Sequence, residues 1–244
     1  MVTLDVAAMD FREVNRRLRE LVSTEEQVVI QNPHGLHNFA IGLQGRLDII
    51  VKGNLGVYVG GFMEGPSITV CGDTGWYAAD NMIAGRLVVE GSTGSNPAPS
   101  MIGGTVVIKG HGGSRVGYGL KGGDLVVFGN VGLETGKMMM GGRIVVLGDA
   151  GAKVGESMYG GVIHVLGRVD SAGDNVVVGS PQGAEAQGLS ALLNALDLRV
   201  VPSAFSTFLP RPGKHVYTLF RPGRRGETPA DAGADRRRGG HDHM

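Results

Sequence analysis

Short stretches with alternating aliphatic residues recur every 19 residues along the middle of the chain. Each stretch ends at a glycine, and these marker glycines are Gly53, Gly72, Gly91, Gly110, Gly129, Gly148 and Gly167. Four residues before them lie Ile49, Ile68, Leu87, Val106, Leu125, Ile144 and Ile163, and two residues before them lie Val51, Val70, Val89, Ile108, Val127, Val146 and Val165. Because strand side chains point alternately to opposite faces, both columns lie on one face of a five-residue strand.

The length of the repeat predicts the fold. A unit of 19 residues is too short for a helical hairpin repeat or a propeller blade, but it suits one coil of a parallel β-helix. Left-handed hexapeptide helices would carry an apolar residue at every sixth position, and this chain does not. We therefore predict an all-β fold, a right-handed single-stranded parallel β-helix with 19-residue coils, capped by short N- and C-terminal helices.

The glycine content agrees with tight coils. The chain has 43 glycines among 244 residues, more than twice the usual share of about 7%. A second glycine column follows three residues after the markers and fails only at Asp170. Closed coils turn sharply several times per circuit, often with positive φ, which glycine tolerates.

The N-terminal part predicts a cap and an irregular first coil. Residues 1–27 are expected to form a capping helix, whose first turn carries a capping-box pattern at Asp10 and Glu13. Residues 28–180 form the β-helix of seven regular coils plus a degenerate first coil. One repeat ahead of the first regular strand, Ile30 falls in the inward column and Asn32 falls where an aliphatic residue belongs.

The C-terminal part predicts a second helix near 185–197, within a segment of helix and extended capping arm over 181–222. The aromatic residues of the arm are Phe205, Phe208, Tyr217 and Phe220. Residues 223–244 are rich in Arg, Gly and Asp and are expected to form a disordered tail.

Charge and cysteine content exclude several classes of protein. Lys plus Arg and Asp plus Glu both total 23, whereas a nucleic-acid-binding protein usually has a basic excess. Cys71 is the one cysteine, so an internal disulfide is impossible, as is typical of a reducing compartment. No signal sequence or membrane-spanning run is visible. We expect a cytoplasmic protein that binds neither nucleic acid nor membranes.

Candidate chemical sites all have structural explanations. The methionine column is explained by an internal ladder rather than a metal site, and its members are Met63, Met82, Met101, Met139 and Met158, with Leu120 completing it. The segment 132–138 differs from a phosphate-binding loop in its glycine spacing and in having Met138 in place of Ser or Thr. His34 and His37 lack further ligands at a metal spacing. We therefore expect no catalytic, cofactor-binding or metal-binding residues.

One outward strip of the strands is apolar where a solvated face would be polar. It is formed by Val88, Val107, Val126, Phe128, Val145, Leu147 and Leu166. An exposed strip of this kind requires a cover. Either the chain's own C-terminal helix or arm covers it, or the strip is a candidate docking face for a partner subunit.

The repeat in residues 139–151, Met-Met-Gly-Gly-Arg-Ile-Val-Val-Leu-Gly-Asp-Ala-Gly, resembles the GXGXG repeat of the C-terminal β-helix domain of the glutamate synthase large subunit. The resemblance covers residues 28–175, and one of the subunits of formylmethanofuran dehydrogenase has the same pattern. The flanking segments 32–38 and 214–220 resemble the stand-alone glutamate-synthase-like subunit type, which includes the β-helix subunit of N-methylglutamate synthase. At residues 95–99 the sequence Ser-Asn-Pro-Ala-Pro departs from the pattern.

This resemblance implies a non-catalytic scaffold subunit. In that family, FMN and an iron–sulfur cluster are bound by a partner synthase subunit, and a further partner is amidotransferase-like. The implied role of this chain is to bridge the two. Two alternatives stay open, namely a scaffold of a formylmethanofuran dehydrogenase-type complex and a β-helix enzyme that acts alone.

Overall fold

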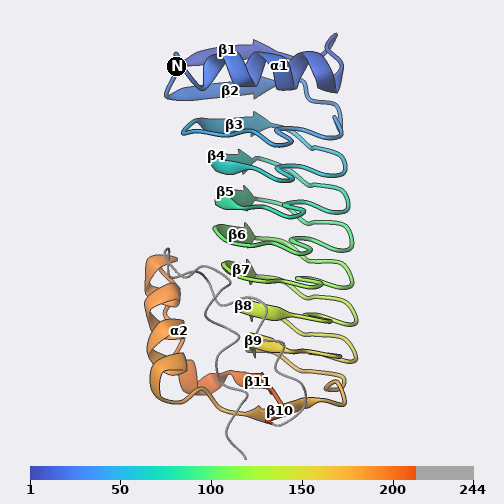
Figure 1. Ribbon diagram of the computed structural model, residues 1–244, viewed down its shortest axis with the longest axis vertical. Coiled ribbons are helices and arrows are strands. Elements are labelled where there is room, and N and C mark those ends of the chain that lie inside the picture. Colours follow the sequence, from blue (N-terminus) through green and yellow to red (C-terminus); the bar gives the residue numbers. More distant parts are fainter. Residues whose placement is uncertain (213–244) are drawn as a thin grey trace, which may run out of the picture.

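The computed structural model describes residues 1–212, which form a rod of stacked coils (Figure 1). The strands in chain order are β1 (Val2–Asp5), β2 (Gln27–Gln31), β3 (Asp48–Lys52), β4 (Glu64–Val70), β5 (Ala84–Val89), β6 (Thr105–Ile108), β7 (Asp124–Val127), β8 (Met140–Val146), β9 (Gly160–Val165), β10 (Val176–Gly179) and β11 (Ser206–Pro210). The helices are α1 (Phe11–Leu21), α2 (Gly183–Ala195) and the 3-10 turn η1 (Pro202–Ala204). The described strands make one sheet in the order β1 to β9, then β11, then β10.

The stacking of the regular coils follows the repeat. From β3 to β9 every strand pairs in parallel with the next, and the aliphatic columns are in register, as in the pairs Ile49–Ile68 and Leu125–Ile144. These side chains are buried, and so is the whole methionine column with Leu120. The predicted parallel β-helix with 19-residue coils is confirmed, and the methionine ladder is part of its core.

The turns of each coil rely on left-handed backbone. Five, seven and nine residues after each of the first six marker glycines the chain has positive φ, as at Tyr58, Gly60 and Phe62, with φ of 60°, 65° and 56°. The marker glycines themselves serve close stacking: a Cβ at Gly110 would lie 2.6 Å from the carbonyl oxygen of Gly91 in the preceding coil. The glycine columns therefore follow from the geometry of the coils.

A polar ladder that the sequence analysis did not identify runs along the corner after the strands. The side chain that follows each of the first six marker glycines accepts a hydrogen bond from the backbone N–H of its equivalent 19 residues later. Asn54 Oδ1, for example, accepts from Asp73 N at 2.8 Å, and Asn130 Oδ1 accepts from Asp149 N at 2.9 Å. The full set of acceptors is Asn54, Asp73, Ser92, His111, Asn130 and Asp149. The ladder satisfies donors that coil stacking would otherwise leave unpaired.

The first coil is longer than predicted. Val28 pairs with Ile49 and Ile30 pairs with Val51, so this coil has 21 residues instead of 19. Val28 and Ile30 are both fully buried, whereas Asn32 is exposed and has a φ of 55°. The prediction that Asn32 occupies an inward position was wrong, because two additional residues lie in the loop between β2 and β3.

The N-terminal cap contains a strand as well as the predicted helix. β1 pairs in parallel with β2, and α1 connects them (Figure 1). Asp10 is the N-cap residue of α1, and its Oδ1 accepts from Glu13 N at 2.9 Å. Val14 and Leu18 of α1 are fully buried in the same core cluster as Val28. The helix therefore closes the first end of the rod.

The C-terminal helix does not cap the other end. α2 lies along the flank of the sheet, beside the later strands (Figure 1). β11 returns antiparallel between β9 and β10, with Thr207 opposite His164, and Phe208 joins the main core. Tyr217, Phe220 and the predicted tail at 223–244 lie outside the described residues.

Candidate docking surface

The apolar strip predicted as a docking face is covered by the chain itself over its later coils. Val126 and Val145 are fully buried in a second core cluster with Leu189 and Leu193 of α2 and with Phe205. Three further strip residues pack against the same cluster, namely Phe128, Leu147 and Leu166. Val88 and Val107 are 8% and 2% exposed. The structure thus supports the self-cover alternative, and the strip is not free for a partner.

Arg143 of β8 fixes α2 in this place. Its guanidinium donates a hydrogen bond to the carbonyl oxygen of Gly188 in α2 and pairs with Asp124 at 3.3 Å. Hydrogen bonds from a charged donor are stronger than neutral ones. α2 is therefore held both by its leucines and by a specific polar contact.

His164 of β9 is buried beneath the C-terminal segment. Its side chain is 0% exposed, its Nδ1 lies 3.0 Å from Thr207 Oγ1, and its Nε2 has no hydrogen-bond partner among the described residues. Burial, aided by the positive charge of Arg143, lowers the pKa of His164 to about 4. The imidazole is neutral near pH 7 and shielded from solvent, so it suits packing rather than acid–base catalysis.

The segment that resembles a phosphate-binding loop is occupied by an ion-pair cluster. Glu134 accepts from Lys137 at 2.7 Å and from Arg115 at 2.8 Å. These hydrogen bonds lower the pKa of the Glu134 carboxyl. Because Lys137 pairs with an ionised carboxylate of its own turn, the cluster stabilises the coil wall and does not form a phosphate site.

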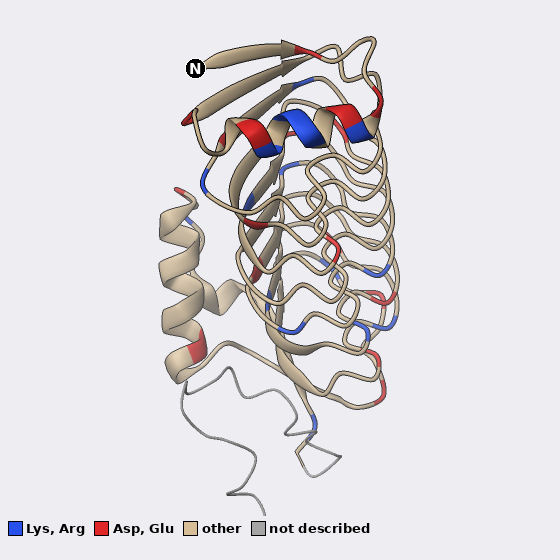
Figure 2. Ribbon diagram, turned by 45° about the horizontal axis from the view of Figure 1, so that its top comes forward, with Lys and Arg blue, Asp and Glu red and all other residues tan. Residues whose placement is uncertain are grey.

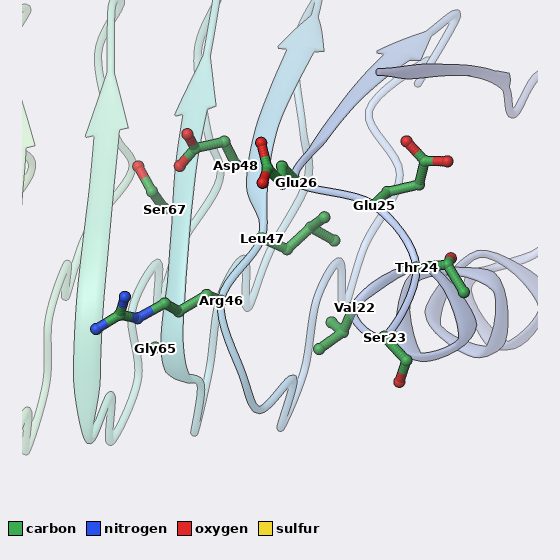
Figure 3. A pocket seen from close by; sticks show the side chains of 10 residues that line it. All are labelled: Val22, Ser23, Thr24, Glu25, Glu26, Arg46, Leu47, Asp48, Gly65 and Ser67. Atoms are coloured by element: carbon green, nitrogen blue, oxygen red, sulfur yellow. The ribbon is translucent and has the colours of Figure 1, made fainter.

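A hollow of about 720 Å³ lies between the end of α1 and strands β2 to β4. Figure 3 shows that Glu25 and Arg46 lie on opposite sides of it. The Glu25 carboxylate instead pairs with the N-terminal amine at 3.0 Å. Among residues 1–212 no group of three or more His, Cys, Asp or Glu side chains could hold a metal ion.

A second hollow of about 540 Å³ lies between α1 and the neighbouring coils. Several aromatic side chains lie in and around it. We define this aromatic surface as Phe11, Tyr58, Phe62, Trp76 and Tyr77. Phe11, Tyr58 and Phe62 line the hollow, and the Tyr58 and Tyr77 rings stack with centroids 4.9 Å apart. Tyr58, Phe62 and Trp76 are 36%, 49% and 57% exposed. Trp76 is the single tryptophan of the chain.

The backbone makes these exposed aromatics unusual. Tyr58 and Phe62 have positive φ, and bulky residues seldom adopt this conformation. At the position of Phe62, four other coils carry the small or polar residues Asn81, Ser100, Gly119 and Ser157, and one coil carries Met138. Residues held in such backbone conformations concentrate at functional sites. The sequence signal was present, but it lies in the turns rather than in the strands.

A second exposed apolar feature is a row at the corner ahead of the strands. Ile83, Ile102 and Met140 occupy equivalent positions of their coils and are 38%, 50% and 43% exposed. Lys121 occupies the equivalent position between Ile102 and Met140, so Ile83 and Ile102 are the pair on consecutive coils. The described surface therefore exposes large apolar side chains at two positions of the coil.

The fold and these surfaces define a β-helix protein with a packed interior and several exposed aromatic and aliphatic side chains. The chain belongs to the GXGXG motif family, whose sequence model matches residues 9–180. This membership confirms the resemblance found in the repeat. None of the described helices is long and apolar enough to cross a membrane.

Proteins similar to the chain include one relative found by sequence and one found by structure. Protein GlxC of Rhizobium meliloti (strain 1021) is 36% identical over 72 residues, which are 29% of this chain and 32% of GlxC. The match thus spans about a third of that relative's length. A chain of the formyltransferase/hydrolase complex (FhcABCD) from Methylorubrum extorquens, solved with methylofuran, is similar in structure with a TM-score of 0.50 and 26% identity. That similarity covers 62% of this chain and 68% of the other.

Proposed function

We propose that this chain is a non-catalytic scaffold subunit of a glutamate-synthase-like complex of the N-methylglutamate synthase type. It bridges a glutamine-amidotransferase-like subunit and a synthase subunit. Membership of the GXGXG motif family supports this proposal, as do the flanking segments 32–38 and 214–220. The similarity to a chain of a multi-subunit complex agrees with a role as a subunit.

The observation that carries the proposal is the contrast between interior and surface. One continuous apolar core extends from Val6 to Phe208 through the coils. The surface exposes Phe62 and Trp76, and aromatic residues are enriched at protein interfaces. A rod with a packed apolar core and exposed aromatic side chains is suited to binding other chains.

The chemistry of the complex belongs to the partners in this proposal. FMN and an iron–sulfur cluster are bound by the synthase subunit, and this chain binds neither. The complex acts in the cytoplasm, where the exposed thiol of Cys71 stays reduced.

A second candidate is a scaffold of a formyltransferase/hydrolase-type or formylmethanofuran dehydrogenase-type complex. The structural similarity to a chain of FhcABCD favours it. The two candidates differ in their partner subunits and cofactors, so one purification distinguishes them.

The test is purification of the tagged chain from its native host at low salt, with mass spectrometry of the stoichiometric partners. The proposal predicts an amidotransferase-like chain and a flavoprotein, with a flavin absorbance spectrum and bound iron. Formyltransferase- or hydrolase-like partners without flavin would instead identify the second candidate. A chain that elutes alone contradicts both.

A further inference from the structure

The arginines of α1 are not equivalent. Arg16 pairs with Glu13 at 2.6 Å and with Glu20 at 2.5 Å, and Arg17 lies 3.3 Å from Glu13. Arg12 and Arg19 have no carboxylate within ion-pair distance among the described residues. Figure 2 shows the mixed charge along this helix. Two of its four positive charges are therefore uncompensated.

Arg12 and Arg19 both line the hollow of the aromatic surface. The guanidinium of Arg12 lies 4.9 Å from the centre of the Phe11 ring. Stacking on an aromatic face restricts a guanidinium and leaves its donors available for a carboxylate. The α1 side of the hollow is thus positively charged and partly preorganised.

The opposite side of the hollow is apolar and aromatic. Ile41, Tyr58 and Phe62 line this side together with Asn38, whereas Phe11 belongs to α1. Asp80 is the one carboxyl group in the lining, and it accepts a hydrogen bond from Asn81 Nδ2 at 2.9 Å. Burial raises the pKa of Asp80.

We propose that the aromatic surface binds an acidic segment of a partner subunit, with a large apolar side chain of the segment in the hollow and its carboxylates on Arg12 and Arg19. This inference rests on the proposed function, because it requires a partner subunit. The hollow is an open groove, and at about 540 Å³ it suits side chains of a polypeptide. Fully desolvated aromatic and arginine residues carry most of the energy of such interfaces.

The test places a photoreactive benzoylphenylalanine at Phe62 of the tagged full-length chain, expressed in the native host. A matched control carries the same residue at Leu133, which is 47% exposed on a later coil. The purified complex is irradiated, and the crosslinked peptides are sequenced by mass spectrometry. Crosslinking at position 62 is expected to join the chain to one segment of a partner subunit with an excess of Asp and Glu.

A charge-reversal pair tests the role of the arginines. The double variant Arg12→Glu/Arg19→Glu is expected to lower the crosslinking yield at position 62 at least tenfold at low salt. The control Arg46→Glu/Arg199→Glu makes the same change of net charge at exposed arginines away from the aromatic surface and is expected to leave the yield unchanged. Thermal unfolding of each purified chain establishes that the variants are folded.

Phe62→Asn separates assembly from folding. Asparagine adopts positive φ readily, and it is the residue that the next coil has at this position, Asn81. The variant is expected to unfold at the same temperature as the original chain or higher, while losing the partner subunit.

Three results would overturn the inference: a crosslink to another copy of this chain, a crosslink to a segment without acidic excess, or a yield that Arg12→Glu/Arg19→Glu leaves unchanged. An assembled complex that shows no crosslink at position 62 would also overturn it. Those results leave the scaffold proposal standing, whereas a chain without partners contradicts both.

Discussion

The buried His164 makes the fold sensitive to mild acid. Its pKa falls from an ordinary 6.5 to about 4 in the folded chain, so between these values the unfolded chain takes up a proton that the folded chain does not. The contribution of neutral His164 to the free energy of unfolding is therefore fully present above pH 6.5. It is lost as the pH falls toward 4. At about 1.4 kcal/mol per pKa unit, the loss approaches about 3 kcal/mol. This is a large part of the 5–15 kcal/mol of a typical domain.

The assay is guanidinium unfolding followed by circular dichroism at pH 7.5, 6.5, 5.5 and 4.5. His164→Val removes the titrating group and inserts the residue found at the equivalent position of β5 to β8, as at Val126 and Val145. The original chain is expected to lose about 2.5 kcal/mol more than this variant between pH 7.5 and 4.5. His34→Asn, which removes an exposed histidine, is expected to follow the original chain. Parallel profiles for the original chain and His164→Val would refute the reasoning.

Three further predictions concern the fold. Arg143→Ala removes the contact to Gly188 and is expected to destabilise the chain by about 2 kcal/mol. It is also expected to speed proteolysis within α2. The control Arg168→Ala, at an exposed ion pair, is expected to change neither stability nor proteolysis. Asn130→Ala removes the acceptor for Asp149 N and is expected to cost about 1 kcal/mol in chemical unfolding, against no loss for Asn194→Ala at an exposed position. Met101→Ala empties part of the internal ladder and is expected to cost about 2–5 kcal/mol; a loss below about 1 kcal/mol would contradict the packing described.

The sequence predicted the regular coils because stacking imposes one environment on each position. Val106, Leu125 and Ile144 lie above one another, so any change in coil length would disrupt the core and the period stays visible. The same reasoning failed at Asn32, where two additional residues in a loop shift the register and leave no trace in the period. β1 was missed because four residues give too short a pattern.

The candidate site was predicted less well. The leucines of α2 were visible, and so was the apolar strip. However, their contact depends on the chain reversing direction after β10, which local sequence does not specify. The sequence did not predict the aromatic surface, because only the glycines of the turns were considered and not their aromatic residues. Tyr58 and Phe62 stand out once their positive φ is known.

In the proposed function, this chain holds two partner subunits together. The most direct measurement is size-exclusion chromatography of extracts from the native host with and without the gene for this chain, following both partners by mass spectrometry. If the chain bridges them, the amidotransferase-like subunit and the flavoprotein are expected to elute together only when the chain is present. Joint elution that persists without the chain would contradict it.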